Sequence, residues 1–210
     1  MSDGAPTRGR IDKREAIVRA AFTVFARRGY DQACVQEIAD TAHVAKPTVY
    51  NHLTDKATLF RHALEAAADT VGNRCVAAVD LLRAPGNDLT ETFNAMAGEL
   101  LSACADEQGR ALHRLAHSAT KDFPELAESV HRRTAARLTD ALADRLAQLM
   151  LSQRLRSCPP DLAAEQFLSL LTGPMEHRSR LSTYEVPAAD ITSIAHAGVD
   201  TFLRAYAPAG

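Results

Sequence analysis

The chain has 210 residues, enough for one or two domains with a buried core and too few for an α/β barrel. Its apolar residues include 39 Ala and 23 Leu against 11 Val and 5 Ile, and only 5% of the chain is aromatic, with no Trp. Ala and Leu are strong helix formers, so this composition predicts an all-α protein and argues against a substantial β-sheet. The formal charge of −2 gives no sign of a nucleic-acid partner.

The sequence also indicates where the protein resides. It contains no run of about 18 apolar residues, and its first ten residues lack the apolar run of a secretory signal, so we expect no membrane span and a cytoplasmic protein. The cysteines are far apart and form no metal-binding spacing with histidine, which favours reduced thiols that act as small buried hydrophobes. They are Cys34, Cys75, Cys104 and Cys158.

The N-terminal third is predicted to contain three helices. Residues 1–10 are rich in Gly, Pro and polar residues and are expected to form a disordered arm. From Asp12, apolar residues recur at three- and four-residue steps until Gly29, which indicates an amphipathic helix with a glycine stop. Short helices follow over 34–41 and 46–53. The turn Ala42-His43-Val44 lies between them, and two short helices joined in this way are typical of a helix-turn-helix.

The rest of the chain completes a prediction of about nine helices. Thr54 and Asp55 are predicted to cap a long helix that runs to about Arg83, where the sequence APGN breaks it. Its roughly 44 Å, at 1.5 Å per residue, is long enough to connect two domains. Further helices are predicted over 88–105, 108–121, 124–155, 161–182 and 187–206.

A resemblance to the DNA-binding domain of the TetR family of bacterial transcriptional regulators covers about 50 residues, AIVRAAFTVFARRGYDQACVQEIADTAHVAKPTVYNHLTDKATLF. It implies a helix-turn-helix domain over residues 11–55, and a ligand-binding and dimerisation domain over 56–210. It also implies a homodimer that binds palindromic double-stranded operator DNA. The matching elements are Ala20-Ala21, Phe25, Gly29-Tyr30, Ile38-Ala39, the run Val44 to Tyr50, and Asp55-Lys56 before Leu59-Phe60.

The third predicted helix is expected to read bases in the major groove, because the first turn of a recognition helix faces base edges. Lys46, Pro47 and Thr48 occupy that turn, and the amide of Gln36 on the preceding helix suits adenine. Tyr50 fits two interpretations, a DNA contact or a ring in the core with a solvated hydroxyl. The resemblance implies phosphate contacts for Tyr50, His52 and Lys56, and either role for Asn51. Two interpretations remain for the basic residues near the N-terminus: contacts with the DNA backbone or minor groove, or a merely solvated tail. These residues are Arg8, Arg10, Lys13 and Arg14.

Two residues depart from the family pattern. His43 stands where the turn commonly has glycine, and a left-handed conformation there costs on the order of 1 kcal/mol. Ala45 stands where the recognition helix commonly begins with Ser or Thr, which gives up a cap worth about 1 kcal/mol. Both departures are expected to lower the stability of the small domain.

The near-neutral total charge hides two unlike halves. Residues 1–62 hold 10 Lys and Arg against 7 Asp and Glu, a net +3, whereas residues 63–210 hold 14 against 19, a net −5. The basic half is the one with the helix-turn-helix. We therefore expect DNA binding that depends on two such heads in a dimer and weakens steeply with salt.

The last two predicted helices carry apolar stripes that the resemblance assigns to a homodimer interface. The alternative is burial within one subunit. Ala195 and Gly198 are small enough to let two helices approach closely. The residues predicted for this interface are Phe167, Leu168, Leu171, Met175, Ile191, Ile194, Ala195, Gly198 and Phe202.

An effector pocket is predicted between the long helix and the helices after Pro85. Its aliphatic character favours a neutral or acidic apolar small molecule. No metal is expected, because two histidines four residues apart need further ligands. The alternatives are ordinary core for the apolar members and exposed or satisfied histidines. The predicted lining is Phe93, Met96, Leu100, Cys104, His113, His117, His177 and Arg178.

A second, shorter resemblance lies in ALHRLAHSATKDFPELAE, which is similar to the regulatory domain of one TetR subgroup. In that subgroup a leucine-rich helix is followed by Phe-Pro-Glu-Leu, here Phe123 to Leu126. Together these features predict a ligand-responsive transcriptional repressor without a cofactor. A helical small-molecule carrier or enzyme that retains the fold is the alternative, although no catalytic constellation and no GxGxxG or GxxxxGK motif is present.

Overall fold

The computed structural model describes residues 5–208, and the side chains of residues 12–208. Within these bounds the chain is helical, without strands, and the predicted order of nine helices is confirmed. The seventh of them runs from α7 into α8 through a π-helical turn, Arg132–Ala136, and a 3₁₀ turn, Asp80–Arg83, ends the fourth. The helices are α1 (Ala5–Gln32), α2 (Val35–Thr41), α3 (Lys46–His52), α4 (Lys56–Val79), α5 (Leu89–Ala105), α6 (Glu107–Ala119), α7 (Pro124–His131), α8 (Arg137–Leu151), α9 (Pro160–Ser179) and α10 (Ala188–Tyr206).

The start of α1 differs from the prediction of a disordered arm over residues 1–10. The helix begins at Ala5, because Pro6 is tolerated in a first helical turn and the arginines that follow are good helix formers. Residues 1–4 of the predicted arm, and the side chains of Arg8 and Arg10, lie outside the described part. At the other end, Gly29 (φ 73°) interrupts the helical geometry where the sequence predicted a stop.

The chain divides into two compact units, and each of them is made of two separate stretches of sequence. The first unit contains the residues up to Ala68 together with Leu115–Val130, and the second contains Asp69–Arg114 and the residues from His131 on. The sequence predicted a boundary after residue 55. The first unit is larger because α4 begins in it and because a segment from far along the chain returns to it.

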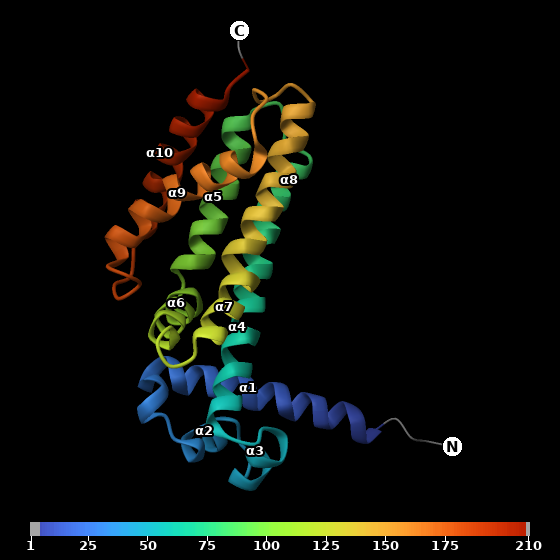
Figure 1. Ribbon diagram of the computed structural model, residues 1–210, viewed down its shortest axis with the longest axis vertical. Coiled ribbons are helices and arrows are strands. Elements are labelled where there is room, and N and C mark those ends of the chain that lie inside the picture. Colours follow the sequence, from blue (N-terminus) through green and yellow to red (C-terminus); the bar gives the residue numbers. More distant parts are fainter. Residues whose placement is uncertain (1–4, 209–210) are drawn as a thin grey trace. The chain divides into compact units, whose positions relative to one another are not determined.

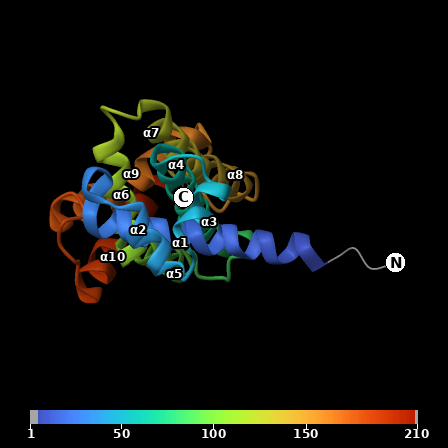
Figure 2. The ribbon, with the colours of Figure 1, turned by 90° about the horizontal axis from the view of Figure 1, so that it is seen from below.

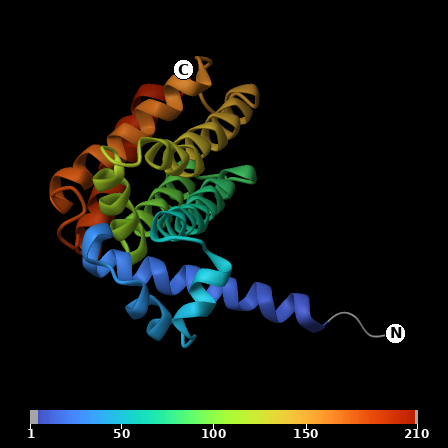
Figure 3. The ribbon, with the colours of Figure 1, turned by 60° about the horizontal axis from the view of Figure 1, so that its bottom comes forward.

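The first unit is built on the helix-turn-helix (Figures 2 and 3). Helix α2 packs on α1, and α3 packs on α2. Two ion pairs reinforce the contact of α1 with α2, since the guanidinium groups of Arg27 and Arg28 lie 3.3 and 3.5 Å from the carboxylate of Glu37. Its fully buried apolar side chains include Ile17, Val24, Phe25, Ile38, Ala39, Val49, Leu59 and Phe60.

The second unit is a helical bundle in which α10 packs on α5 and α9, and α9 packs on α8 (Figure 1). Three buried rings join its helices: Phe167 lies 5.6 Å from Phe93 and 4.8 Å from Phe202, between ring centroids. Phe93 and Phe202 are 5.7 Å apart, so the three rings form one cluster contributed by α5, α9 and α10.

Most of the predicted dimer-interface residues are part of this core. A stripe at helical spacing shows that a face is buried, and here α9 and α10 pack on one another and on α8 and α5 within one chain. Gly198 serves the same packing, because a Cβ there would lie 2.8 Å from the Leu171 side chain. Leu168 and Ile191 keep intermediate exposure. The residues that the prediction placed at a partner, and that are buried instead, are Phe167, Leu171, Met175, Ile194, Ala195, Gly198 and Phe202.

A second close approach occurs between α4 and the π-helical turn. A Cβ on Gly72 would overlap the backbone carbonyl oxygen of Arg133. The guanidinium of Arg133 pairs with Asp69 at 2.8 Å, and that of Arg137 donates to the side-chain oxygen of Asn73 at 2.7 Å. One face of α4 is therefore held against this turn by polar bonds at either side of a glycine.

Candidate nucleic-acid interface

The turn between α2 and α3 contains a left-handed residue at His43, which is the condition under which the sequence predicted backbone strain. Its backbone N–H groups close the end of α2, with His43 donating to Asp40 at 3.1 Å and Val44 to Ala39 at 3.0 Å. His43 is left-handed, with φ 54°, and Ala45 caps α3 without any side-chain hydrogen bond. The two departures from the family pattern therefore carry the expected backbone strain and missing cap.

Helix α3 presents one face to the core and the opposite face outward. Val49 is 1% exposed and Leu53 is 3% exposed, so both anchor the helix. Tyr50 is 45% exposed, which excludes the alternative of a core ring. The outward positions are Lys46, Pro47, Tyr50 and Asn51, with Thr48 and His52 half-buried at their edges. The structure thus brings six of the predicted DNA-binding residues together on one short helix.

Gln36 on α2 is exposed but its amide is already engaged. Its Nε2 donates to the carboxylate of Asp40 at 2.9 Å, four residues along the same helix. This bond uses one of the two N–H donors of the amide, so the second N–H donor and the side-chain oxygen are not engaged by Asp40.

Lys56, at the first position of α4, is held by the end of α1. Its ammonium donates to the backbone carbonyl oxygen of Asp31 at 2.9 Å and lies 4.8 Å from the centroid of the Tyr30 ring. Burial and the nearby carboxylates of Asp55 and Asp31 raise the pKa of Tyr30 above its usual value. The sequence identified the cation, but nothing in the pattern showed that a backbone carbonyl and a ring hold it.

Asp55 confirms the predicted start of α4. Its carboxylate accepts a hydrogen bond from the backbone N–H of Thr58 at 2.7 Å, three residues into the helix. This backbone bond is the main reason that the pKa of Asp55 lies below its usual value. The cap therefore fixes the residue at which α4 begins.

The predicted effector residues do not converge on one cavity. Phe93, Met96 and Leu100 are fully buried in α5, in agreement with the alternative that the apolar members are ordinary core residues. Cys104 is a free cysteine, and a hydrogen bond with the Cys75 thiol, together with burial, raises the pKa of its thiol. Two of the remaining four are exposed but bonded: His113 Nδ1 lies 3.2 Å from Ser182 Oγ, and Arg178 donates to the Asp190 carbonyl oxygen at 3.2 Å. His117 and His177 are exposed, and His117 lies in the first unit whereas His113 lies in the second.

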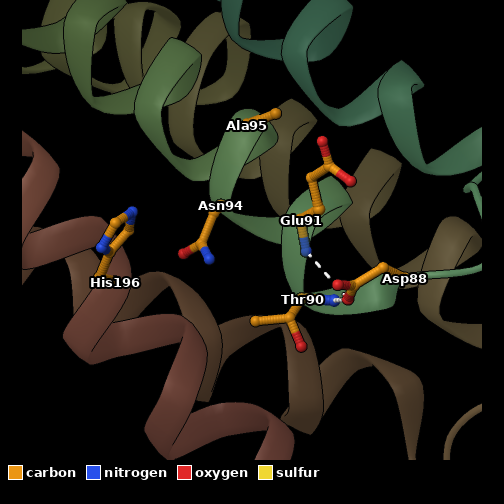
Figure 4. A pocket seen from close by; sticks show the side chains of 6 residues that line it. All are labelled: Asp88, Thr90, Glu91, Asn94, Ala95 and His196. Carbon is orange, nitrogen blue, oxygen red and sulfur yellow. Dashed lines mark hydrogen bonds between the residues drawn. The ribbon is translucent and has the colours of Figure 1, made fainter.

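A pocket of about 630 Å³ does open elsewhere in the second unit, at the start of α5 and the middle of α10. Figure 4 shows Asn94 and His196 facing one another across it. The carboxylate of Asp88 caps α5 by accepting from the backbone N–H groups of Thr90 and Glu91, at 2.8 and 3.3 Å. The Asn94 side-chain oxygen is buried and has no hydrogen-bond partner in the described structure. The sequence did not single out any of these residues.

Two features are absent from residues 5–208. No group of three or more His, Cys, Asp or Glu side chains in this part of the chain is arranged to hold a metal ion. None of its helices is long and apolar enough to cross a membrane.

Comparison with known proteins places both regions of the chain in one family. Residues 17–63 match the bacterial regulatory proteins of the tetR family, and residues 91–208, more than half of the chain, match the C-terminal domain of AefR-like transcriptional repressors. A solved protein from Mesorhizobium loti, described as a TetR-family transcriptional regulator, is 27% identical with a TM-score of 0.87, over 94% of this chain and 98% of that one. The flavonoid-responsive regulator FrrA shares the fold, with a TM-score of 0.70 at 24% identity.

Curated relatives match mainly through the N-terminal region. The transcriptional activator FasR of Mycolicibacterium smegmatis is 39% identical over 62 residues, 30% of this chain and 28% of FasR. The repressor KstR2 of the same species is 29% identical over 83 residues, 40% of either chain. The match thus spans less than half the length of these two relatives. With its two regions matched in order by the two regions of one family, the chain belongs to the TetR family of bacterial regulatory proteins.

Proposed function

We propose that the protein is a dimeric transcriptional repressor that binds palindromic operator DNA and is released from it by a small apolar effector. The observation that carries the DNA-binding part is the outward face of α3, where Lys46, Pro47, Tyr50 and Asn51 are exposed on a helix anchored by its opposite side. A helix presented this way fits the major groove. Repression is favoured by the match of residues 91–208 to a repressor domain.

The proposed DNA-contacting residues, on α3 and on its neighbours α2 and α4, divide into two roles. Lys46, Thr48 and Gln36 face base edges and specify sequence, whereas Tyr50, His52 and Lys56 contact phosphates. Pro47 packs on a thymine methyl, and Asn51 serves either role. Residues 11–55 form the DNA-binding domain, and residues 56–210 form the domain that binds the effector and the partner. The partner meets the outward sides of α9 and α10, where Leu168 and Ile191 remain accessible.

The division of roles is tested by selecting the operator from fragmented genomic DNA with purified protein, then measuring affinities for that duplex and for a scrambled one. Lys46→Ala and Thr48→Ala are expected to lose about 1–3 kcal/mol of discrimination. Lys56→Ala is expected to weaken both duplexes alike. Lys121→Ala removes the same charge from an exposed position outside α3 and serves as the control. Equal losses on both duplexes for all three variants would refute the division.

The regulatory part is tested by screening small apolar acids and neutral metabolites for thermal stabilisation. A compound that stabilises the protein and also lowers operator affinity supports the repressor. A compound that stabilises it without affecting DNA binding supports the alternative of a carrier. In cells, deletion of the gene should raise transcription of the operator-linked genes, and a fall would indicate an activator.

A further inference from the structure

The Phe-Pro-Glu-Leu motif is not among the proposed DNA contacts, yet the structure places it in the unit that contains the helix-turn-helix. Pro124 is the first residue of α7, and Leu126 is fully buried and donates its backbone N–H to the carbonyl oxygen of Phe123 at 3.0 Å. Further along α7, Ser129 donates to the carboxylate of Glu65 on α4 at 3.1 Å. The motif therefore fixes the backbone at Phe123 and attaches this segment to the first unit.

Phe123 completes a cluster of rings around Tyr30. Its centroid lies 4.9 Å from that of Tyr30, nearly perpendicular to it, and 5.6 Å from that of Phe60. Phe60 is itself 4.9 Å from Tyr30 and from Phe25. Edge-to-face pairs at these separations are favourable arrangements of aromatic rings. The Tyr30 ring is thus held by α4 on one hand and by the segment before α7 on the other.

The same Tyr30 ring supports the ammonium of Lys56, which lies over it and donates to the Asp31 carbonyl oxygen. An ammonium has three N–H donors, and the bond to Asp31 uses one of them. The four-carbon stem of lysine is flexible, so its charge meets a phosphate at a defined place only if something holds it. The ring and the carbonyl supply that support.

We propose that Phe123 is a positioning residue for the contact between Lys56 and the DNA backbone. Phe123 fixes the Tyr30 ring, and the ring and the neighbouring carbonyl fix the ammonium. The inference rests on the proposed phosphate contact of Lys56 and extends it to a residue 67 positions away in sequence. The Phe-Pro-Glu-Leu segment then contributes to DNA binding although it does not itself touch DNA.

The test is the salt dependence of binding by the full-length chain to a fluorescein-labelled duplex of mixed sequence, measured by fluorescence anisotropy. Each phosphate contact that is lost lowers the slope of log K against log salt by about 0.9 for each protomer bound. Lys56→Ala and Phe123→Leu are expected to lower the slope equally, and the double variant no further. Phe123→Tyr keeps a ring and is expected to retain the full slope.

Leu126→Ala separates positioning from stability. It removes a buried side chain from the same segment without removing a ring, so it is expected to lower the melting temperature while leaving the slope unchanged. If Phe123→Leu does not fold, Phe123→Met fills the space with an unbranched side chain and no ring. Circular dichroism confirms that each variant is folded before its slope is measured.

The outcomes are distinct. A full slope in folded Phe123→Leu or Phe123→Met, beside a reduced slope in Lys56→Ala, would overturn the positioning role and leave the phosphate contact intact. A full slope in Lys56→Ala would overturn the phosphate contact and this inference with it. Absence of DNA binding by the unsubstituted chain would overturn the proposed function itself.

Discussion

Replacing Phe167 with alanine tests whether the three-ring cluster stabilises one chain or joins two. Phe167 is fully buried, with neighbouring rings at 5.6 and 4.8 Å. Truncation of such a phenylalanine costs about 3–5 kcal/mol, through lost burial and the cavity left behind. For a chain of this length each kcal/mol lowers the melting temperature by about 2–4 °C, so we expect a fall of roughly 6–20 °C.

The assay is thermal and urea unfolding followed by circular dichroism, with the molecular mass of the native protein measured by sedimentation. Leu168→Ala is the matched control, because its side chain is only half-buried on the same helix. It is expected to cost roughly 1–2 kcal/mol in unfolding and to weaken self-association. A Phe167→Ala protein that dissociates into monomers of unchanged melting temperature would refute intrachain burial and return the ring to an interface between copies.

Three further perturbations test local features. Gly72→Ala is expected to destabilise the protein by about 1–3 kcal/mol, because a Cβ would overlap the Arg133 carbonyl oxygen. Gly98→Ala in α5, where a Cβ meets open space, is expected to stabilise it by up to about 1 kcal/mol; equal urea midpoints for the two would contradict the close approach. Asp88→Ala is expected to cost about 1 kcal/mol through loss of the α5 cap, while Asp88→Asn retains it, as thermal melts of both would show. The lowered pKa of Asp55 means that its contribution to stability is present above the unfolded pKa of about 3.9 and is lost as pH falls through the folded pKa. The difference in melting temperature between the natural chain and Asp55→Ala should therefore shrink below about pH 4, and a difference that grows there would refute the cap.

The helix-turn-helix was predictable because its signals are local. The glycine at the end of the first helix, the capping residue before α4 and the alternation of buried and outward positions on α3 depend on neighbours within a few residues. The side chain of Tyr50 needed the structure, since a tyrosine at helical spacing fits either a core or a surface.

The apolar stripes of the last helices could be predicted as buried faces but not assigned a partner. Periodicity shows that one side of α9 is shielded from water. It does not show whether the helix that covers this side belongs to the same chain or to a second copy. The π-helical turn Arg132–Ala136 also had no signal, because a π turn has the composition of the helix around it. Lys56 illustrates the same limit for charges, since its acceptor is a backbone carbonyl.

The first unit is assembled from two stretches of sequence, and this bears on how such proteins are recombined. Exchanging the first 68 residues for those of a relative would leave residues 115–130 facing a foreign surface, with Phe123 opposite rings it did not evolve beside. A chimera that transplants DNA specificity should therefore carry both stretches, or match the aromatic residues at 30, 60 and 123.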